Sequence, residues 1–401
     1  MNRAFIGALR GDRPRDVVRR ATIIATISFL ILIDLFGAQA LLPQIIRAYG
    51  TDAGTAGIAV NAATFGMALS GLLVAWFADR IDRKRGIWMC LLLLGIPTAL
   101  LSIADSIAVF MALRVVQGVL MAAAFTLTLT YLSEQCQAMA VGGALAAFIT
   151  GNVASNLFGR LAAVTVAGAA GLHGTFIFFA MLNVVGAALA YLVIGPRDDH
   201  PPTRRGAPLD AWRRHLALPG LRAAFAIGFL ILFVFVGVFT YVNLYLVEGL
   251  GVPPMSLGLV YLVFAPAIVT TPMAANVVRR RGARPTLIWS LLVALGGLSL
   301  TLNSFLPVVL LGMATIGAAT FFAQAAATGY VSQAVTQDQA QANGLYLTSY
   351  YLGGLCGAVV LGQVNMAQGW PGTAAAIGLA MGVAIAIATQ LKTPALSKTP
   401  S

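Results

Sequence analysis

Residues 78–85 read ADRIDRKR, and six of the seven side chains from Asp79 to Arg85 are charged. In the whole chain of 401 residues only 9% are Asp, Glu, Lys or Arg, whereas 59% are hydrophobic. A soluble domain carries about 25% charged residues. The low charge content therefore predicts an all-α membrane protein, in which each transmembrane helix needs roughly 20 apolar residues.

Twelve apolar segments are separated by Gly, Pro and charged clusters. We predict transmembrane helices near residues 21–45, 55–78, 86–104, 107–132, 143–168, 174–195, 222–247, 255–278, 285–303, 306–331, 344–367 and 372–391. The longest polar gap predicts a cytoplasmic linker at 196–221. It joins an N-terminal six-helix bundle at 1–195 to a C-terminal six-helix bundle at 222–401.

The basic residues indicate which way the chain faces. All 25 Lys and Arg residues except Arg47, Arg114 and Arg160 fall in polar segments on the same side as the N-terminus. Basic loops are retained on the cytoplasmic side of a membrane. We therefore expect a multi-pass protein of the bacterial cytoplasmic (inner) membrane, with both termini in the cytoplasm.

The two predicted halves repeat one another. Tyr131-Leu-Ser matches Tyr330-Val-Ser, and Gly118 matches Gly317, each pair lying 199 residues apart. Parallel repeats of six helices are typical of secondary transporters, which bind their substrate between the repeats near the bilayer midplane.

The charged stretch lies between the second and third predicted helices. Residues 75–85, AWFADRIDRKR, resemble the G-x-x-x-D-R-x-G-R-K/R pattern of the major facilitator superfamily, although Ala75 and Asp82 replace its glycines. The resemblance implies a conformational latch, in which a carboxylate caps a helix terminus across the interface between the halves. A plain basic anchor is the alternative. The latch residues that match the pattern are Asp79, Arg80, Arg83 and Lys84.

Two further stretches resemble one branch of the same superfamily. Leu113-Arg114-Val-Val-Gln117-Gly118 is similar to the R-x-x-Q-G motif of proton-coupled members. Residues 151–160, GNVASNLFGR, fit the register of the antiporter motif G-x-x-x-G-P-x-x-G-G, with three replacements. These matches imply a twelve-span drug:H⁺ antiporter-like protein of the arabinose-efflux-permease type. They imply nothing about the substrate.

Two opposite charges lie deep in the predicted membrane. An ionisable residue at the bilayer centre costs about 2.5–3.5 kcal/mol on insertion scales, so Asp34 and Arg114 indicate a function. Apolar surroundings and a nearby arginine shift a carboxyl pKa in opposite directions. We expect Asp34 to exchange a proton and Arg114 to modulate that exchange. The alternative is a structural ion pair that holds two helices together.

The remaining predicted site residues would line a substrate cavity. Arg160 either faces that cavity, which would favour an anionic or zwitterionic substrate over a cationic one, or extends to the membrane surface. The other candidates are polar or aromatic residues within predicted helices, each of which alone is more often a helix–helix contact. They are Asn61, Asn152, Asn156, Tyr241, Tyr245, Gln324, Tyr346 and Tyr350.

These features predict a secondary active transporter that moves a small molecule by alternating access, with proton-coupled efflux favoured. Proton-linked uptake of a small metabolite, with anionic metabolites included, is the alternative within transport. An enzyme is less favoured, because the chain has no P-loop, H-E-x-x-H or G-x-S-x-G motif, and a channel does not need two repeated halves. We expect no cofactor or metal, no nucleic-acid partner, the proton gradient as the energy source, and a functional monomer in the lipid bilayer.

Overall fold

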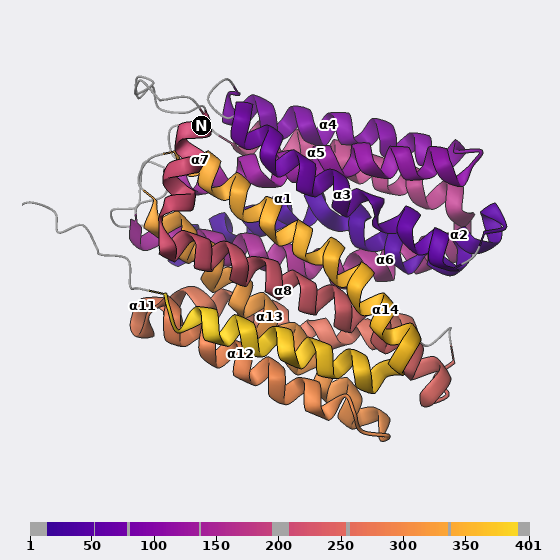
Figure 1. Cartoon of the computed structure of the whole chain (residues 1–401). Coiled ribbons are helices and arrows are strands. Elements are labelled where there is room, and N and C mark those ends of the chain that lie inside the picture. Colours follow the sequence, from indigo (N-terminus) through magenta and orange to yellow (C-terminus); the bar gives the residue numbers. More distant parts are fainter. Residues whose placement is uncertain are drawn as a thin grey trace, which may run out of the picture.

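The computed structural model describes residues 14–51, 53–77, 81–135, 138–194, 208–253, 257–335 and 338–391. These residues are almost entirely helical. Figure 1 shows long helices lying side by side in two groups, with the indigo-to-magenta helices above and the orange-to-yellow helices below.

In the N-terminal half, the described residues form five long helices and two short ones. Their bounds are α1 Pro14–Ala40, α2 Leu42–Tyr49, α3 Ala53–Phe77, α4 Arg83–Leu100, η2 Leu101–Ile103, α5 Ile107–Gln135 and α6 Ala138–Val193.

The C-terminal half follows the short helix α7 and contains one segment that is broken into several turns. The bounds are α7 Pro208–Ala217, α8 Pro219–Leu244, η3 Tyr245–Gly249, α9 Leu257–Val260, η5 Tyr261–Phe264, α10 Ala265–Thr270, η6 Thr271–Met273, α11 Ala274–Arg281, α12 Ala283–Leu300, α13 Leu306–Ala334 and α14 Gln339–Ala388.

Helices α6 and α14 each cross the molecule twice. Straight helices of 56 and 50 residues would be about 75 Å long or more, whereas a bilayer core is about 30 Å thick. Each of these two helices reverses direction at a glycine with a positive φ angle, which is 68° at Gly171 in α6 and 62° at Gly369 in α14. This backbone conformation strongly favours glycine, which has no Cβ atom.

Ten helices in the described ranges are long and apolar enough to span a membrane, and α6 and α14 each supply two crossing segments. The predicted all-α fold of twelve transmembrane helices in two pseudo-repeated six-helix bundles is therefore confirmed. The predicted domain bounds, 1–195, 196–221 and 222–401, stay a prediction. Residues 196–207 of the linker lie outside the described residues, and α7 lies within its remainder.

Prolines break two of the predicted helices. The helix predicted at 21–45 is divided into two. Helix α1 ends at Ala40, and α2 begins at Leu42 with a proline in its first turn. The segment predicted at 255–278 contains two 3₁₀ turns, η5, which precedes Pro266 in the first turn of α10, and η6, which contains Pro272. Proline lacks the N–H that a continuing α-helix needs and clashes with the preceding turn.

The packing inside each half repeats. Helix α6 packs on α1, and a Cβ atom added to Gly151 would lie 2.0 Å from the carbonyl oxygen of Ala25. Helix α14 packs on α8, and a Cβ atom added to Gly353 would lie 2.0 Å from the carbonyl oxygen of Phe229. Glycine permits this close approach of two helices.

Two sets of helices form the seam between the halves. Helix α3 packs on the first half of α14, where Thr348 donates a hydrogen bond to the carbonyl oxygen of Ala68 at 3.3 Å. Asn343 donates to Thr130 of α5 at 3.4 Å. On the other side, α6 packs on the broken segment from η5 to α11.

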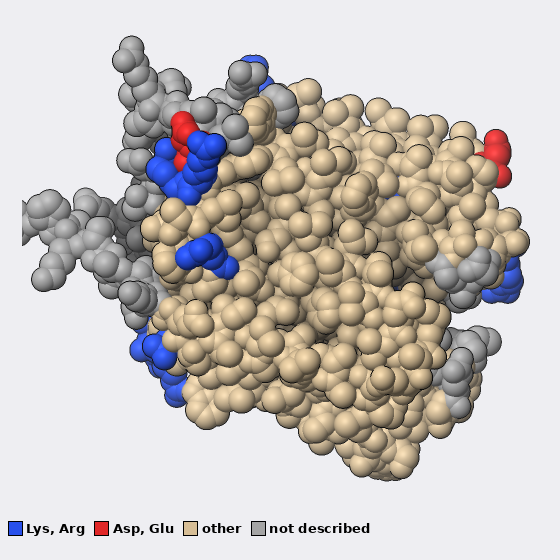
Figure 2. All heavy atoms as spheres, viewed as in Figure 1, with Lys and Arg blue, Asp and Glu red and all other residues tan. Residues whose placement is uncertain are grey.

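One end of the molecule carries most of the described basic residues, and we call it the basic end. It includes the start of α4 at Arg83, the helix α7, and the last turn of α11, Arg279–Arg281. Figure 2 shows blue side chains gathered at this end and a broad tan surface between it and the opposite end. This arrangement is typical of a membrane protein with a basic surface on one side.

Candidate functional site

Asp34 lies in the middle of the N-terminal half and is completely buried. Three neutral side chains from three other helices donate hydrogen bonds to its Oδ2 atom. The donors are Thr98 of α4 at 3.2 Å, Gln117 of α5 at 3.3 Å and Asn183 of α6 at 3.2 Å. The Oδ1 atom has no hydrogen-bond partner. Asp34 therefore links four helices through one of its oxygens and leaves the other unoccupied.

Arg114 is also completely buried, and its partners are neutral. Its Nε and Nη2 atoms donate to the carbonyl oxygen of Val60 at 3.1 and 2.9 Å. Its Nη1 atom donates to Oε1 of Gln117 at 2.8 Å. Because a guanidinium can only donate, the oxygen of Gln117 faces Arg114, and its nitrogen faces Asp34.

Asp34 and Arg114 consequently form no direct ion pair within the described structure. They are connected through the amide of Gln117. Each ionisable group has neutral partners of its own, so a change in the charge of Asp34 leaves Arg114 hydrogen-bonded. This arrangement differs from a direct pair, in which protonating the carboxylate would remove the direct charged partner of a buried cation.

Arg160 is the centre of a second polar network, on α6. Its Nη2 atom donates to Oε1 of Gln39 at 2.8 Å, and its Nε atom donates to Oδ1 of Asn156 at 3.0 Å. Gln39 then donates to Asn61 of α3 at 3.2 Å. The guanidinium carbon lies 4.2 Å from the ring centroid of Tyr261, which belongs to the other half of the molecule. Arg160 is 5% exposed and reaches the seam between the halves rather than the membrane surface.

Three of the predicted cavity residues therefore belong to one network, which joins Arg160, Asn156 and Asn61. Asn152 lies one turn from Asn156 on α6, and its Oδ1 atom has no partner. Gln324 of α13 is 2% exposed and its Oε1 atom also lacks a partner.

The four predicted tyrosines lie in the C-terminal half and form two groups. Tyr346 and Tyr350 of α14 stack with ring centroids 6.2 Å apart, and Tyr346 is completely buried. Tyr241 donates a hydrogen bond to the carbonyl oxygen of Ala358, and Tyr245 donates to that of Asn303 at 3.0 Å. The hydroxyls of Tyr241 and Tyr245 are therefore used within the C-terminal half.

The predicted latch is described only in part, because Asp79 and Arg80 lie outside the described residues. Arg83 is 2% exposed and donates to the carbonyl oxygen of Ile81 at 3.1 Å. The Lys84 ammonium lies 5.2 Å from the ring centroid of Tyr191. Asp82 caps α4, since its side chain accepts a hydrogen bond from the backbone N–H of Arg85 at 2.8 Å.

Sequence reasoning missed four residues of these networks, namely Gln39, Thr98, Asn183 and Tyr261. Thr98 follows Pro97, the one proline inside α4, and its hydroxyl bonds back to the carbonyl oxygen of Leu94 at 2.7 Å. Asn183 is a lone amide in an apolar segment, which is the signal that could have identified it. Nothing in the sequence indicates that Tyr261 faces Arg160.

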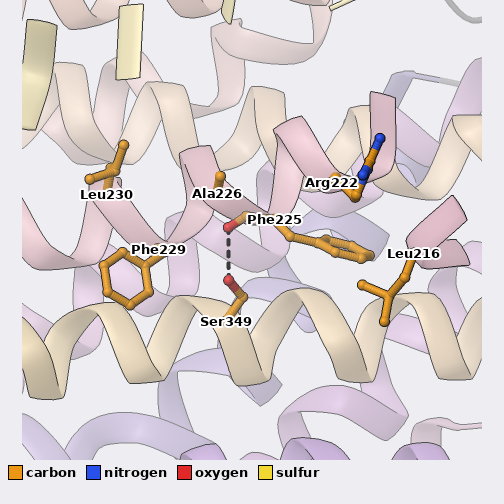
Figure 3. A pocket seen from close by; sticks show the side chains of 7 residues that line it. All are labelled: Leu216, Arg222, Phe225, Ala226, Phe229, Leu230 and Ser349. Atoms are coloured by element: carbon orange, nitrogen blue, oxygen red, sulfur yellow. Dashed lines mark hydrogen bonds between the residues drawn. The ribbon is translucent and has the colours of Figure 1, made fainter. Parts of the chain in front are cut away.

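A surface hollow of about 430 Å³ lies elsewhere, at the basic end between α7, α8 and α14. Figure 3 shows Leu216, Arg222 and Phe225 around it, with the hydroxyl of Ser349 bonded to the carbonyl oxygen of Phe225. Its lining contains none of the predicted site residues. Among the described side chains, no group of three His, Cys, Asp or Glu residues gathers that could hold a metal ion.

Comparison with known proteins relates this geometry to a family. The sequence profile of the Major Facilitator Superfamily matches residues 24–269 and 261–401. The inner membrane transport protein YnfM of Escherichia coli (strain K12) is 28% identical over 370 residues, covering 89% of this chain and 86% of that protein. The uncharacterized MFS-type transporter YybF of Bacillus subtilis (strain 168) is 24% identical over 332 residues, covering 80% of each.

Solved structures share the fold at low sequence identity. The human organic anion transporter MFSD10 (TETRAN) has a TM-score of 0.78 and 14% identity, covering 94% of this chain and 100% of that one. The transporter FucP, in the outward conformation, has a TM-score of 0.76 and 16% identity, covering 94% and 99%. With a profile match along most of its length and twelve membrane-spanning segments in two repeated halves, the chain belongs to the Major Facilitator Superfamily of membrane transporters.

Proposed function

We propose that this transporter couples the movement of a small molecule to the movement of protons, and that Asp34 carries the proton. The observation that carries the proposal is the environment of Asp34. It is a completely buried carboxylate whose three donors are neutral and all bind Oδ2, while Oδ1 has no partner. A proton-coupled cycle needs a group that is charged in one state and neutral in another.

The neutral partners suit such a cycle. Oδ1 is the free position for a proton, since no donor occupies it. The hydroxyl of Thr98 has one hydrogen and two acceptors in reach, Oδ2 of Asp34 at 3.2 Å and the carbonyl oxygen of Leu94 at 2.7 Å. When Asp34 binds a proton, the Thr98 hydroxyl can therefore give up its bond to Oδ2 and donate to the carbonyl oxygen of Leu94 instead. The bonds of Arg114 to Val60 and Gln117 do not depend on the charge of Asp34, since neither acceptor is ionisable.

We propose export as the direction of transport, with the basic end in the cytoplasm of a bacterial inner membrane. The support is the basic surface at that end and the resemblance of residues 113–118 and 151–160 to motifs of proton-coupled exporters. The latch proposal for Asp79 and Arg80 rests on the sequence pattern alone. Arg83 and Lys84, which the structure describes, lie at the first turn of α4, at the basic end.

The test is transport by the purified protein in proteoliposomes. A panel of radiolabelled small molecules with positive, negative and zero net charge is offered with and without an imposed pH gradient. The proposal expects at least one compound to accumulate against its own concentration gradient, and a protonophore to abolish the accumulation. Equal flux with and without the pH gradient for every transported compound would contradict proton coupling. The sign of the pH gradient that drives accumulation tests the direction.

A further inference from the structure

Arg160 places a positive charge at the seam between the two halves. It projects from α6 in the N-terminal half and lies over the face of Tyr261, in η5 of the C-terminal half, at 4.2 Å from the ring centroid. The ring of Phe36 lies 5.9 Å from the guanidinium carbon. Aromatic faces attract a guanidinium, but they do not neutralise its charge.

No described carboxylate supplies the missing negative charge. Arg160 is 5% exposed and forms no ion pair in the described parts of the chain. Two of its hydrogen bonds go to neutral amide oxygens, those of Gln39 and Asn156, and the side chain of Tyr261 is a further neutral partner. A buried cation in a membrane normally pairs with an anion or marks a substrate path. In contrast, the half-exposed Arg214 at the basic end forms an ion pair with Asp338 at 2.6 Å.

Asn156 adds an unused donor beside this charge. Because a guanidinium has no acceptor, the oxygen of Asn156 must face Arg160, and its amide nitrogen must face away. That nitrogen is buried and has no hydrogen-bond partner. Buried N–H groups without a partner are rare in native structures. The amide nitrogen of Gln39, in contrast, already donates to Asn61. The unused hydrogen-bonding group beside the Arg160 cation is therefore a donor, the amide nitrogen of Asn156.

A carboxylate is the ligand group that fits this arrangement, since it is negatively charged and only accepts hydrogen bonds. One turn away, Oδ1 of Asn152 is an unused acceptor, but Arg160 holds the only charge in this network. The rings of Phe36 and Tyr261 provide apolar surface for the body of the ligand. Tyr261 also lies in a 3₁₀ turn within a membrane-spanning segment, and such turns often mark hinges.

We propose that Arg160 and Asn156 bind the carboxylate of an organic monoanion with an apolar body, and that the ring of Tyr261 occupies the guanidinium when the ligand is absent. The ligand would then join the two halves across the seam. This proposal rests on the proposed transport function and names its substrate class.

The test is binding to the purified protein in detergent, where no proton gradient exists. The probes are benzoate, phenylacetate and hexanoate, each compared with its neutral amide by calorimetry and by the shift in thermal unfolding. Charge-assisted hydrogen bonds are about twice as strong as neutral ones. We therefore expect at least one carboxylate to bind on the order of tenfold more tightly than its amide. Equal affinity within all three pairs, or no binding by any carboxylate, would overturn the proposal.

Two substitutions separate a binding role from a structural one. Arg160→Gln should lower carboxylate affinity to the level of the amide, whereas Arg222→Gln, at an exposed arginine of the basic end, should leave it unchanged. Asn156→Asp keeps the size of the side chain and places an internal anion beside Arg160. It should abolish carboxylate binding while raising the unfolding temperature. If Asn156→Asp or a folded Arg160→Gln protein binds the carboxylate as the wild type does, Arg160 is not the ligand site.

The binding experiment and the transport experiment fail in different ways. Carboxylate binding without flux driven by a pH gradient would contradict proton-coupled transport but keep the site. Gradient-driven flux of cations or neutral compounds, with no carboxylate binding, would contradict the site but keep the transporter.

Discussion

Asp34 and Arg114 are both completely buried in the N-terminal half, yet they are joined by the amide of Gln117 rather than by a direct ion pair. The oxygen of Gln117 accepts from Arg114 at 2.8 Å, and its nitrogen donates to Asp34 at 3.3 Å. Gln117 therefore connects the carboxylate to the arginine through hydrogen bonds while keeping the two charges apart.

Replacing Gln117 with Met should test this connection. Methionine fills a similar volume but leaves Nη1 of Arg114 without its acceptor. An unsatisfied buried polar group costs about 1–3 kcal/mol, so we expect Gln117→Met to lower the thermal unfolding temperature in detergent. The exposed Gln363 of α14 offers a matched control. If Gln117→Met and Gln363→Met unfold at the same temperature, the amide bridge contributes nothing to stability.

Gly353→Ala should push α14 away from α8 at their closest contact. The added Cβ atom would meet the backbone of Phe229, which cannot move without shifting the helix. Overpacking of this kind costs about 1–3 kcal/mol, and we expect a lower unfolding temperature. Gly382→Ala, later on α14, meets nothing within 4 Å and should be neutral or slightly stabilising. Equal unfolding temperatures for the two variants would contradict the close helix contact.

The contact between α7 and the start of α14 should depend on pH. His215 contacts the carbonyl oxygen of Asp338 at 3.3 Å, beside the ion pair of Arg214 with Asp338. Burial lowers the pKa of His215 below its ordinary value, against the opposing effect of Asp338. Folding therefore favours the neutral imidazole. The contribution of His215 to the free energy of unfolding is fully present above about pH 6.5, the ordinary pKa of histidine. This contribution declines as the pH falls below that value.

His215→Gln should remove part of this loss of stability below about pH 6.5. The measurement is the unfolding temperature from pH 8 to pH 5 in the wild type and the variant. His173→Gln, at an exposed histidine of the opposite end, serves as the control and should keep the wild-type profile. A His215→Gln profile that parallels the wild type would assign the acid sensitivity to other groups.

The two aspartates of the charged loop should differ in their effects. Asp79→Asn should reduce transport without changing the yield of folded protein, because it removes the proposed latch and keeps the basic residues. Asp82→Gly is the matched control. Asp82 caps α4, and glycine at a helix N-cap costs only a few tenths of a kcal/mol relative to Asp. The measurement is the transport rate in proteoliposomes. Equal rates for Asp79→Asn and the wild type would contradict the latch and indicate that the loop is only a basic anchor.

Hydropathy and charge were sufficient to predict the twelve helices, because a bilayer demands long apolar segments with internally bonded backbones. The break at Leu41 was missed, since the apolar run continues past Pro43 and conceals it. The division of α9–α11 was missed for a related reason. Apolar composition indicates that a segment crosses the membrane but not whether its turns are α or 3₁₀.

A charge was the strongest signal for the candidate site, although the neutral residues Asn61 and Asn156 were also predicted. Asp34, Arg114 and Arg160 were identified because charged residues are rare within apolar segments. Their neutral partners carry a weaker signal: Thr98 is a common residue type, and Asn183 is marked only as a lone amide in an apolar segment. The contacts of both residues depend on how four helices pack. The contact of Arg160 with Tyr261 depends on the placement of one whole half against the other, which no local sequence pattern specifies.

The most direct test of the central claim compares accumulation with exchange in Asp34→Asn. Asparagine fills the site and still accepts hydrogen bonds, but it cannot bind and release a proton. For a compound that the wild type accumulates under a pH gradient, we expect Asp34→Asn to lose accumulation and to keep the exchange of labelled for unlabelled compound. Asp105→Asn, at an exposed residue of the opposite end, should keep both. Accumulation by Asp34→Asn at the wild-type level would contradict the account and make Asp34 a structural residue.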